Sequence, residues 1–174
     1  MKFINPSKEY LKSYYEGCVE MWNNIHNNYI IHNPNDYDKW KDTIFTDFSN
    51  QEKGINLPDG YVPSVTYWIV SENEYIGSIN IRLKLNDNLK FYGGHIGIAI
   101  KPSKQNNIYG YKAWLWAYKK AKELNISPIL VTCYKSNVSS KRLLTSKYSN
   151  YYKVEEDTIE ENGTPHEIMR FWYK

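Results

Sequence analysis

The stretch that decides the fold runs from His95 to Glu123 and reads HIGIAIKPSKQNNIYGYKAWLWAYKKAKE. Isoleucine alternates with glycine or alanine up to Ile100, which predicts a strand, and Pro102 ends it. Apolar residues then recur three or four positions apart, which predicts a helix from about residue 109 to residue 124. The turn between these elements lies where the N–H groups and the dipole of a helix N-terminus attract anions. The sequence therefore predicts a strand, an anion-binding turn and a helix in direct succession.

The residues on either side of this stretch predict an α/β (α+β) chain. Before it come a short strand, two amphipathic helices and an antiparallel hairpin, and after it a buried strand, a short helix and a closing hairpin. A strand, crossover helix and strand around residues 95–134 should hold two parallel strands in an otherwise antiparallel sheet. The approximate predicted segments are strands 3–4, 65–70, 75–83, 95–100, 129–134, 149–159 and 166–173, helices 7–29, 37–51, 109–124 and 137–147, and a loop at 85–94.

Length and composition fit a single domain over residues 1–174. The formal net charge is +3, and its lysines and glutamates are scattered, which argues against nucleic acid as a partner. Because no apolar run approaches membrane-spanning length and the N-terminus has no apolar signal core, we expect a cytoplasmic protein without a membrane partner. Cys18 and Cys133 fit no metal spacing, so we expect both in the core and no bound metal.

Three further motifs lie around the opening stretch. Pro63 to Trp68 reads PSVTYW, Leu85 to Asp87 reads LND, and Gly93 to Gly97 reads GGHIG. With these motifs in this order, nearly the whole chain resembles small members of the GCN5-related N-acetyltransferase (GNAT) superfamily. The resemblance implies a mixed, mostly antiparallel twisted sheet with one parallel strand pair and helices on both faces. It also implies acetyl-CoA as co-substrate and direct attack by an amine in a ternary complex.

The turn departs from the pattern of that superfamily, which is Arg or Gln, two residues, Gly, one residue, and Gly or Ala. Gln105 and Gly110 match, but Ile108 replaces the first glycine. One interpretation keeps the turn, with Ile108 at negative φ and pointing inward while Asn106 or Asn107 takes the left-handed conformation. In another, acetyl-CoA binding is weakened or lost, and in a third the stretch is an ordinary loop before an amphipathic helix.

The resemblance also implies which residues contact acetyl-CoA. Backbone N–H groups of the strand would polarise the thioester, and nearby lysines would favour the diphosphate. Two residues after the fifth strand would bind the cofactor arm, with helix capping as the alternative role. The cofactor-binding residues are Ile98, Ala99, Ile100, Gln105, Asn106, Asn107, Ile108, Tyr109, Gly110, Asn137 and Ser140, and the lysines are Lys101, Lys104 and Lys112.

Acid–base groups are sparse in this sequence. The strand that ends at Ile100 contains no carboxylate, so His95 is the candidate general base, with a hydrogen bond that fixes the strand as its alternative role. The resemblance implies a tyrosine after the fifth strand as general acid, and the candidates are Tyr148, after the predicted short helix, and Tyr134, at the end of the strand before it. Cys133 is interpreted as core packing, because direct attack needs no protein nucleophile.

We expect the acceptor, a primary amine of a small molecule, to bind between the N-terminal helices and the loop 86–92. The candidate lining residues are Trp22, His26, Tyr29, Trp40 and Arg82, although packing is an alternative for each of them. Exposed hairpins leave a homodimer open. The rival hypothesis is a GNAT-fold binding module that has lost catalysis, and a weaker one is an aromatic surface for carbohydrate or peptide.

Overall fold

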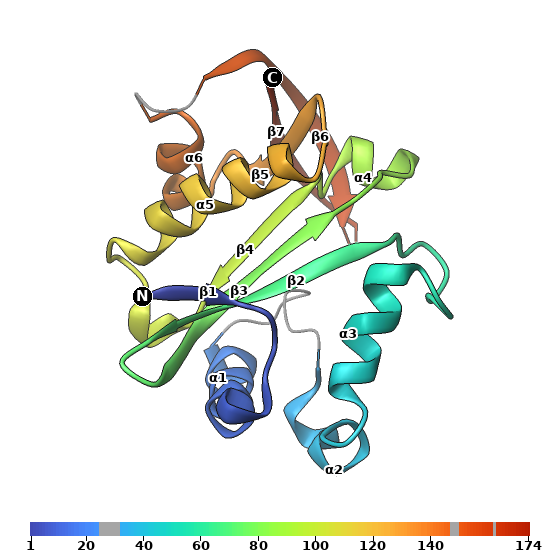
Figure 1. Cartoon of the computed structure of the whole chain (residues 1–174). Coiled ribbons are helices and arrows are strands. Elements are labelled where there is room, and N and C mark those ends of the chain that lie inside the picture. Colours follow the sequence, from blue (N-terminus) through green and yellow to red (C-terminus); the bar gives the residue numbers. More distant parts are fainter. Residues whose placement is uncertain (25–31, 147–149, 162) are drawn as a thin grey trace.

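The computed structural model describes residues 1–24, 32–146, 150–161 and 163–174. Its strands form two antiparallel sheets (Figure 1). The first sheet has the order β1-β2-β3-β4, with β1 at Lys2–Ile4, β2 at Ser64–Ser71, β3 at Glu74–Arg82 and β4 at Ile96–Ile100. The second has the order β5-β7-β6, with β5 at Ile129–Tyr134, β6 at Tyr151–Glu161 and β7 at Thr164–Tyr173.

The hairpin of β2 and β3 shows how local sequence produces the first sheet. β-Branched and aromatic residues fill both strands, and Glu72 and Asn73 join them with φ angles of 52° and 63°. Two consecutive left-handed residues match the right-handed twist of a two-residue hairpin. The predicted hairpin is therefore confirmed, and so is the closing hairpin of β6 and β7.

Helices cover both faces of the first sheet. α1 (Leu11–Asn24) packs on β3 and α3 (Ile44–Lys53) packs on β2, whereas α5 (Tyr109–Glu123) packs on β3 and β4 from the opposite side (Figure 1). The helix predicted over residues 37–51 is divided into α2 (Tyr37–Trp40) and α3. The loop predicted at 85–94 contains a short helix, α4 (Asp87–Phe91), because the Asn86 side chain caps it by accepting from Leu89 N–H at 2.9 Å.

Two hydrophobic clusters lie on opposite sides of the first sheet. On the α5 side, Ala113 and Ala117 bring the helix close to the isoleucines of β3. On the α1 side the cluster is aromatic, and the rings of Tyr14 and Trp68 stack at 4.5 Å. Cys18 and Cys133 are buried in these clusters as predicted, and burial raises the pKa of their thiols to about 12 and about 11.

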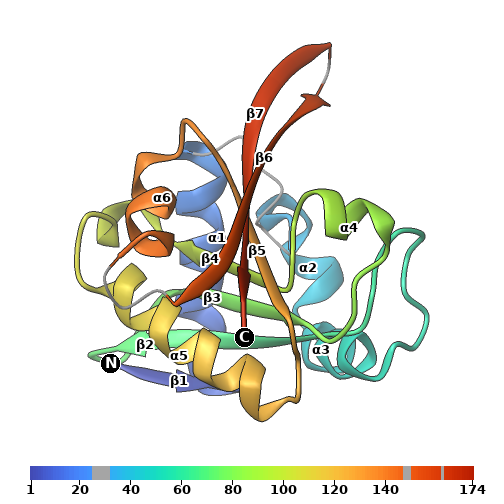
Figure 2. The same cartoon turned by 90° about the horizontal axis from the view of Figure 1, so that it is seen from above.

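The predicted parallel strands β4 and β5 meet where both begin. His95 N–H donates to Leu130 C=O at 2.7 Å, but β4 is the edge of the first sheet and β5 the edge of the second. The mixed α/β fold with helices on both faces is confirmed, but in the described residues β4 and β5 form no parallel ladder. The β6–β7 hairpin projects beyond the helices (Figure 2). Within the described ranges, no helix has the length and apolar character to cross a membrane.

Candidate cofactor cleft and active site

The candidate cofactor site is the outer edge of β4. One edge of this strand pairs with β3 from Ile81↔Ile96 to Gly77↔Ile100, and in the described part of the chain the other edge forms no ladder. Gly97, Ile98, Ala99 and Ile100 are only half-buried, although their strand lies in the middle of the protein. An edge strand leaves alternate N–H and C=O groups for a ligand. The backbone donors predicted on β4 are therefore placed along an open edge.

The turn that follows β4 keeps a defined shape without the missing glycine. Asn106 has a φ angle of 55°, so it takes the left-handed conformation that Asn tolerates. Ile108 has a φ angle of −64° and needs no glycine. The inward orientation expected for Ile108 is wrong, because its side chain is 53% exposed. The Gln105 side chain fixes the turn from the strand side by donating to Ile100 C=O at 2.9 Å.

The first turn of α5 presents N–H groups that the helix itself leaves without carbonyl partners. The bond from Lys112 N–H to Ile108 C=O, at 3.0 Å, is the first of the helix, so Tyr109 and Gly110 have no carbonyl partner inside it. The neighbouring Ile108 N–H is held by Asn107 Oδ1 at 2.7 Å. N–H groups of this kind, together with the helix dipole, form an anion-binding site.

Two of the three lysines expected to favour an anion are already paired with carboxylates. Lys101 is buried and bonds to Glu74, and Lys104 Nζ lies 2.7 Å from the other Glu74 oxygen. The hydrogen bonds from Lys101 and Lys104 lower the pKa of Glu74. Lys112 is exposed on the first turn of α5, so it is the lysine of the three that the structure leaves at the helix N-terminus.

The base role expected for His95 does not fit its surroundings. The ring is buried, and its Nδ1 accepts from Leu130 N–H at 3.0 Å. Burial, with a smaller contribution from Arg82, lowers the pKa of His95 to about 4. A neutral imidazole whose Nδ1 accepts a hydrogen bond carries its proton on Nε2, so neither nitrogen has a lone pair available for an amine proton. These contacts match the alternative role, in which His95 fixes β4 to β5.

Tyr134, at the end of β5, makes contacts through both its ring and its hydroxyl. Its ring lies between Tyr92, with centroids 5.0 Å apart, and His166, with centroids 5.3 Å apart. Its hydroxyl donates to Glu161 Oε2 at 2.6 Å. Residues 129, 131 and 133 belong to the α5-side cluster, so Tyr134 lies on the opposite face of β5 by strand alternation. Tyr148, the other candidate acid, lies outside the described residues.

Asn137 and Ser140 lie together at the start of α6 (Val138–Leu144). Asn137 Oδ1 accepts from Ser140 N–H at 3.0 Å, which is the capping arrangement. The same helix packs against α5, where a Cβ added to Gly110 would lie 3.7 Å from Leu143 Cδ1. Asn137 thus has the capping role, and the Ser140 N–H is its partner.

Of the residues predicted to line the acceptor pocket, the structure describes Arg82, Trp40 and Trp22, which have different surroundings. Arg82 Nη1 donates to the carbonyl groups of Gly93 and Gly94 at 3.1 and 2.9 Å, so it holds the turn that precedes β4. Trp40 is buried in the aromatic cluster, and Trp22 is 44% exposed on α1. His26 and Tyr29 lie outside the described residues.

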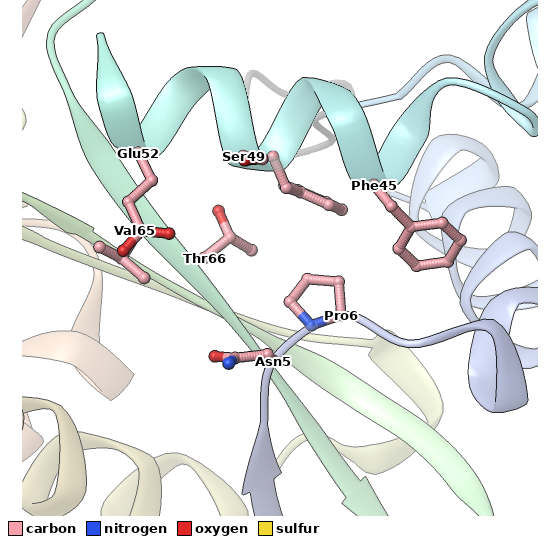
Figure 3. A pocket seen from close by; sticks show the side chains of 8 residues that line it. Asn5, Pro6, Phe45, Ser49, Glu52, Val65 and Thr66 are labelled. Atoms are coloured by element: carbon pink, nitrogen blue, oxygen red, sulfur yellow. The ribbon is translucent and has the colours of Figure 1, made fainter.

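A small cavity lies between α3 and the β1–β2 edge of the first sheet, away from the outer edge of β4 (Figure 3). Its volume is about 160 Å³, and Thr66 and Glu52 approach it from β2 and α3. It contains none of the residues that the sequence assigned to a site. In the parts of the chain that are described, no group of three or more His, Cys, Asp or Glu side chains could hold a metal ion.

Sequence reasoning missed three carboxylates that border the site: Glu20, Glu74 and Glu161. Glu161 bonds to a tyrosine 27 positions away in the sequence, and Glu20 bonds to Ser103, 83 positions away. Such pairs leave no local pattern in a single sequence. Their roles follow from the tertiary structure alone.

Comparison with known proteins gives a family match and a set of similar folds. The profile of the acetyltransferase (GNAT) family matches residues 20–147, and a comparison with curated protein sequences gives no match. The fold resembles a ribosomal-protein-alanine N-acetyltransferase from Brucella melitensis, with 8% identity over 99% of this chain and 98% of that chain, and a TM-score of 0.64. It also resembles microcin C7 self-immunity acetyltransferase MccE in complex with acetyl-CoA and AMP, with 12% identity over 98% and 89% of the two chains and a TM-score of 0.64.

A third similar structure is yncA from Salmonella typhimurium with its cofactor acetyl-CoA, at 10% identity over 99% of this chain and 92% of that chain, with a TM-score of 0.62. Identities this low establish a shared fold and no more. The family profile, however, covers most of the chain, including β4, the turn and α5. The chain therefore belongs to the acetyltransferase (GNAT) family.

Proposed function

We propose that the protein transfers the acetyl group of acetyl-CoA to a primary amine of a small molecule. The observation that carries the proposal is the open edge of β4, which leads directly to the N–H groups that begin α5. An extended thioester arm suits an unpaired strand edge, and a diphosphate suits a helix N-terminus. Structures of the similar folds MccE and yncA contain acetyl-CoA, which supports this choice of donor.

In this proposal the chain itself supplies binding, polarisation and one proton. Tyr109 and Gly110 N–H bind the diphosphate, with Lys112 beside them, and Asn137 and Ser140 border the cofactor arm. Outward-facing N–H groups among Ile98, Ala99 and Ile100 polarise the thioester carbonyl. The amine attacks the carbonyl carbon, the C–S bond breaks, and Tyr134, with Tyr148 as the alternative, gives a proton to the thiolate. The attacking nitrogen loses a proton to solvent, because His95 offers no acceptor, and solvent returns one proton to the tyrosinate.

The acceptor is the second part of the proposal. The exposed Trp22, and His26 and Tyr29 beyond the described ranges, stay candidate lining residues. The similar Brucella melitensis structure is a ribosomal-protein-alanine N-acetyltransferase, so a peptide N-terminus is the natural competitor to a small amine. A test must therefore offer both kinds of acceptor.

Calorimetric titration with acetyl-CoA, followed by a thiol-release assay, tests the proposal. We expect saturable heat at micromolar ligand, and coenzyme A release that depends on adding one of a panel of small primary amines. Peptides with an N-terminal alanine are the comparison acceptors. A flat calorimetric trace at millimolar acetyl-CoA would remove the transferase proposal. Saturable binding without release across the panel would favour the non-catalytic binding module, and release with peptides alone would overturn the small-molecule acceptor.

A further inference from the structure

We propose that Glu20 on α1 is a positioning residue that holds the diphosphate-binding turn in its binding shape. This inference rests on the proposed binding of acetyl-CoA. Both oxygens of the Glu20 carboxylate hydrogen-bond to Ser103. Oε1 accepts from Ser103 N–H at 2.5 Å, and Oε2 accepts from the Ser103 hydroxyl at 3.0 Å. Ser103 lies in the short 3-10 helix Pro102–Lys104 that opens the turn. Glu20, on the N-terminal helix α1, thus holds the segment between β4 and α5.

A chain of alternating charges extends this contact to β3. Lys101 Nζ lies 3.8 Å from Glu20 and bonds to Glu74, which in turn bonds to Lys104. The Lys101 side chain is 8% exposed, so its charge is desolvated and depends on the two carboxylates. Lys101 lies two residues before Ser103, and Lys104 directly follows it. The contacts of these three residues therefore fix the backbone on the strand side of the turn.

The anchors also determine where the N–H groups of the turn point. Lys101 N–H donates to Ile76 C=O at 3.0 Å, and the Gln105 side chain donates to Ile100 C=O at 2.9 Å. Residues 101–105 are thus tied to the first sheet, and the left-handed Asn106 follows at once. A turn held before the ligand arrives loses less conformational entropy on binding, and this raises affinity. Glu20 acts through Ser103 and touches no reacting atom, so its effect should appear in the diphosphate part of binding.

The test is Glu20→Gln, with Glu16→Gln as the matched control. Both glutamates lie on α1, one turn apart, and Glu16 is exposed. The measured quantities are the dissociation constants for acetyl-CoA and for S-acetyl-pantetheine, which has the same thioester and no diphosphate. We expect Glu20→Gln to weaken acetyl-CoA binding about fivefold or more, with less than about a twofold change for S-acetyl-pantetheine. Ser103→Ala should have a smaller effect, because it removes one of the two hydrogen bonds.

The outcomes separate this inference from the proposed function. A wild-type protein that fails to bind acetyl-CoA would overturn both. A wild-type protein that binds, with Glu20→Gln unchanged or with both ligands weakened equally, would overturn the positioning role alone. If Glu20→Gln loses its folded circular-dichroism spectrum, Ser103→Ala decides the matter by the same ratio of the two dissociation constants.

Discussion

At the scale of single residues, the turn before α5 forms without a glycine at position 108. Ile108 has a right-handed helical conformation, and the left-handed position falls on Asn106 instead. The isoleucine side chain is exposed rather than folded into the turn. Its Cβ therefore costs no backbone strain at the proposed anion site.

Substitutions at Ile108 and Asn106 should differ in their effect on acetyl-CoA binding. We predict that Ile108→Gly leaves the dissociation constant for acetyl-CoA within about threefold, because no strain is relieved. Asn106→Val should raise it about tenfold, because a β-branched residue in the left-handed region costs about 1–2 kcal/mol. Asn106→Gly is the control and should bind as the wild type does. A large gain in affinity for Ile108→Gly, measured by calorimetry, would mean that the isoleucine obstructs the site.

Two buried histidines predict how stability depends on pH. Burial lowers the pKa of His95 and of His32 to about 4, against about 6.5 in the unfolded chain. As the pH falls below 6.5 the unfolded chain binds protons first, so the free energy of unfolding should decrease between pH 6.5 and 4 and stay flat above about pH 7. The expected loss is about 2 kcal/mol for each histidine.

Urea denaturation at pH 7.5, 6 and 5 measures this dependence. His95→Asn is the control, because the asparagine oxygen keeps an acceptor for Leu130 N–H without a titratable group. Its unfolding free energy should fall less steeply with acid than that of the wild type. Equal slopes for the two proteins would contradict a neutral, buried His95.

At the scale of elements, β4 pairs with β3 on one edge and forms no ladder on the other in the described residues. Its isoleucines were recognisable from their alternation, and the strand forms where predicted. What the alternation could not indicate is that one edge stays unpaired, since strand pairing depends on how two distant sheets meet. The break between α2 and α3 has a different explanation. Both helices carry apolar residues on one continuous face, so the sequence pattern predicts a single helix.

Gly97 tests whether the space beside β4 is used. Ala99 packs against the cluster on the α1 side, so Gly97, two residues earlier, lies on the same face of β4, toward the expected acceptor. A Cβ built at Gly97 meets nothing within 4 Å, whereas one at Gly77 on β3 would lie 2.1 Å from Ala99 C=O. We predict that Gly97→Val keeps the melting temperature within a few degrees but lowers the rate of acetyl transfer at least about tenfold, because the side chain occupies the proposed acceptor space. Gly77→Ala should instead lower the melting temperature markedly. Full activity in Gly97→Val would show that this space is not used.

At the scale of the whole molecule, two sheets share one strand junction at His95 and Leu130 and separate beyond it. A ligand that fills the space between them should stabilise the protein, because it binds the folded state alone. We predict an added stability of about 2.7 kcal/mol at a ligand concentration one hundred times the dissociation constant. Thermal unfolding with acetyl-CoA and with an equal concentration of AMP measures this, and an equal shift with both would argue against specific binding.

Most of the fold could be predicted from the sequence, but fewer of the contacts at the candidate site could. Strands, hairpins and α5 follow local periodicity, so they could be predicted from single stretches. The roles of Lys101, His95 and Arg82 could not be predicted in this way. A lysine beside a turn gives the same sequence pattern whether its side chain is solvated or paired with the carboxylate of Glu74. A histidine before a strand likewise carries no signal that Leu130 will occupy its Nδ1.

Hydrogen–deuterium exchange with and without acetyl-CoA tests the central claim most directly, since each amide reports its own position. We predict slower exchange in two places on adding the ligand: the outer edge of β4 at residues 98–100, and Tyr109 and Gly110 at the start of α5. Exchange unchanged at both places under saturating acetyl-CoA, or slowed only around the cavity between α3 and β2, would contradict the account.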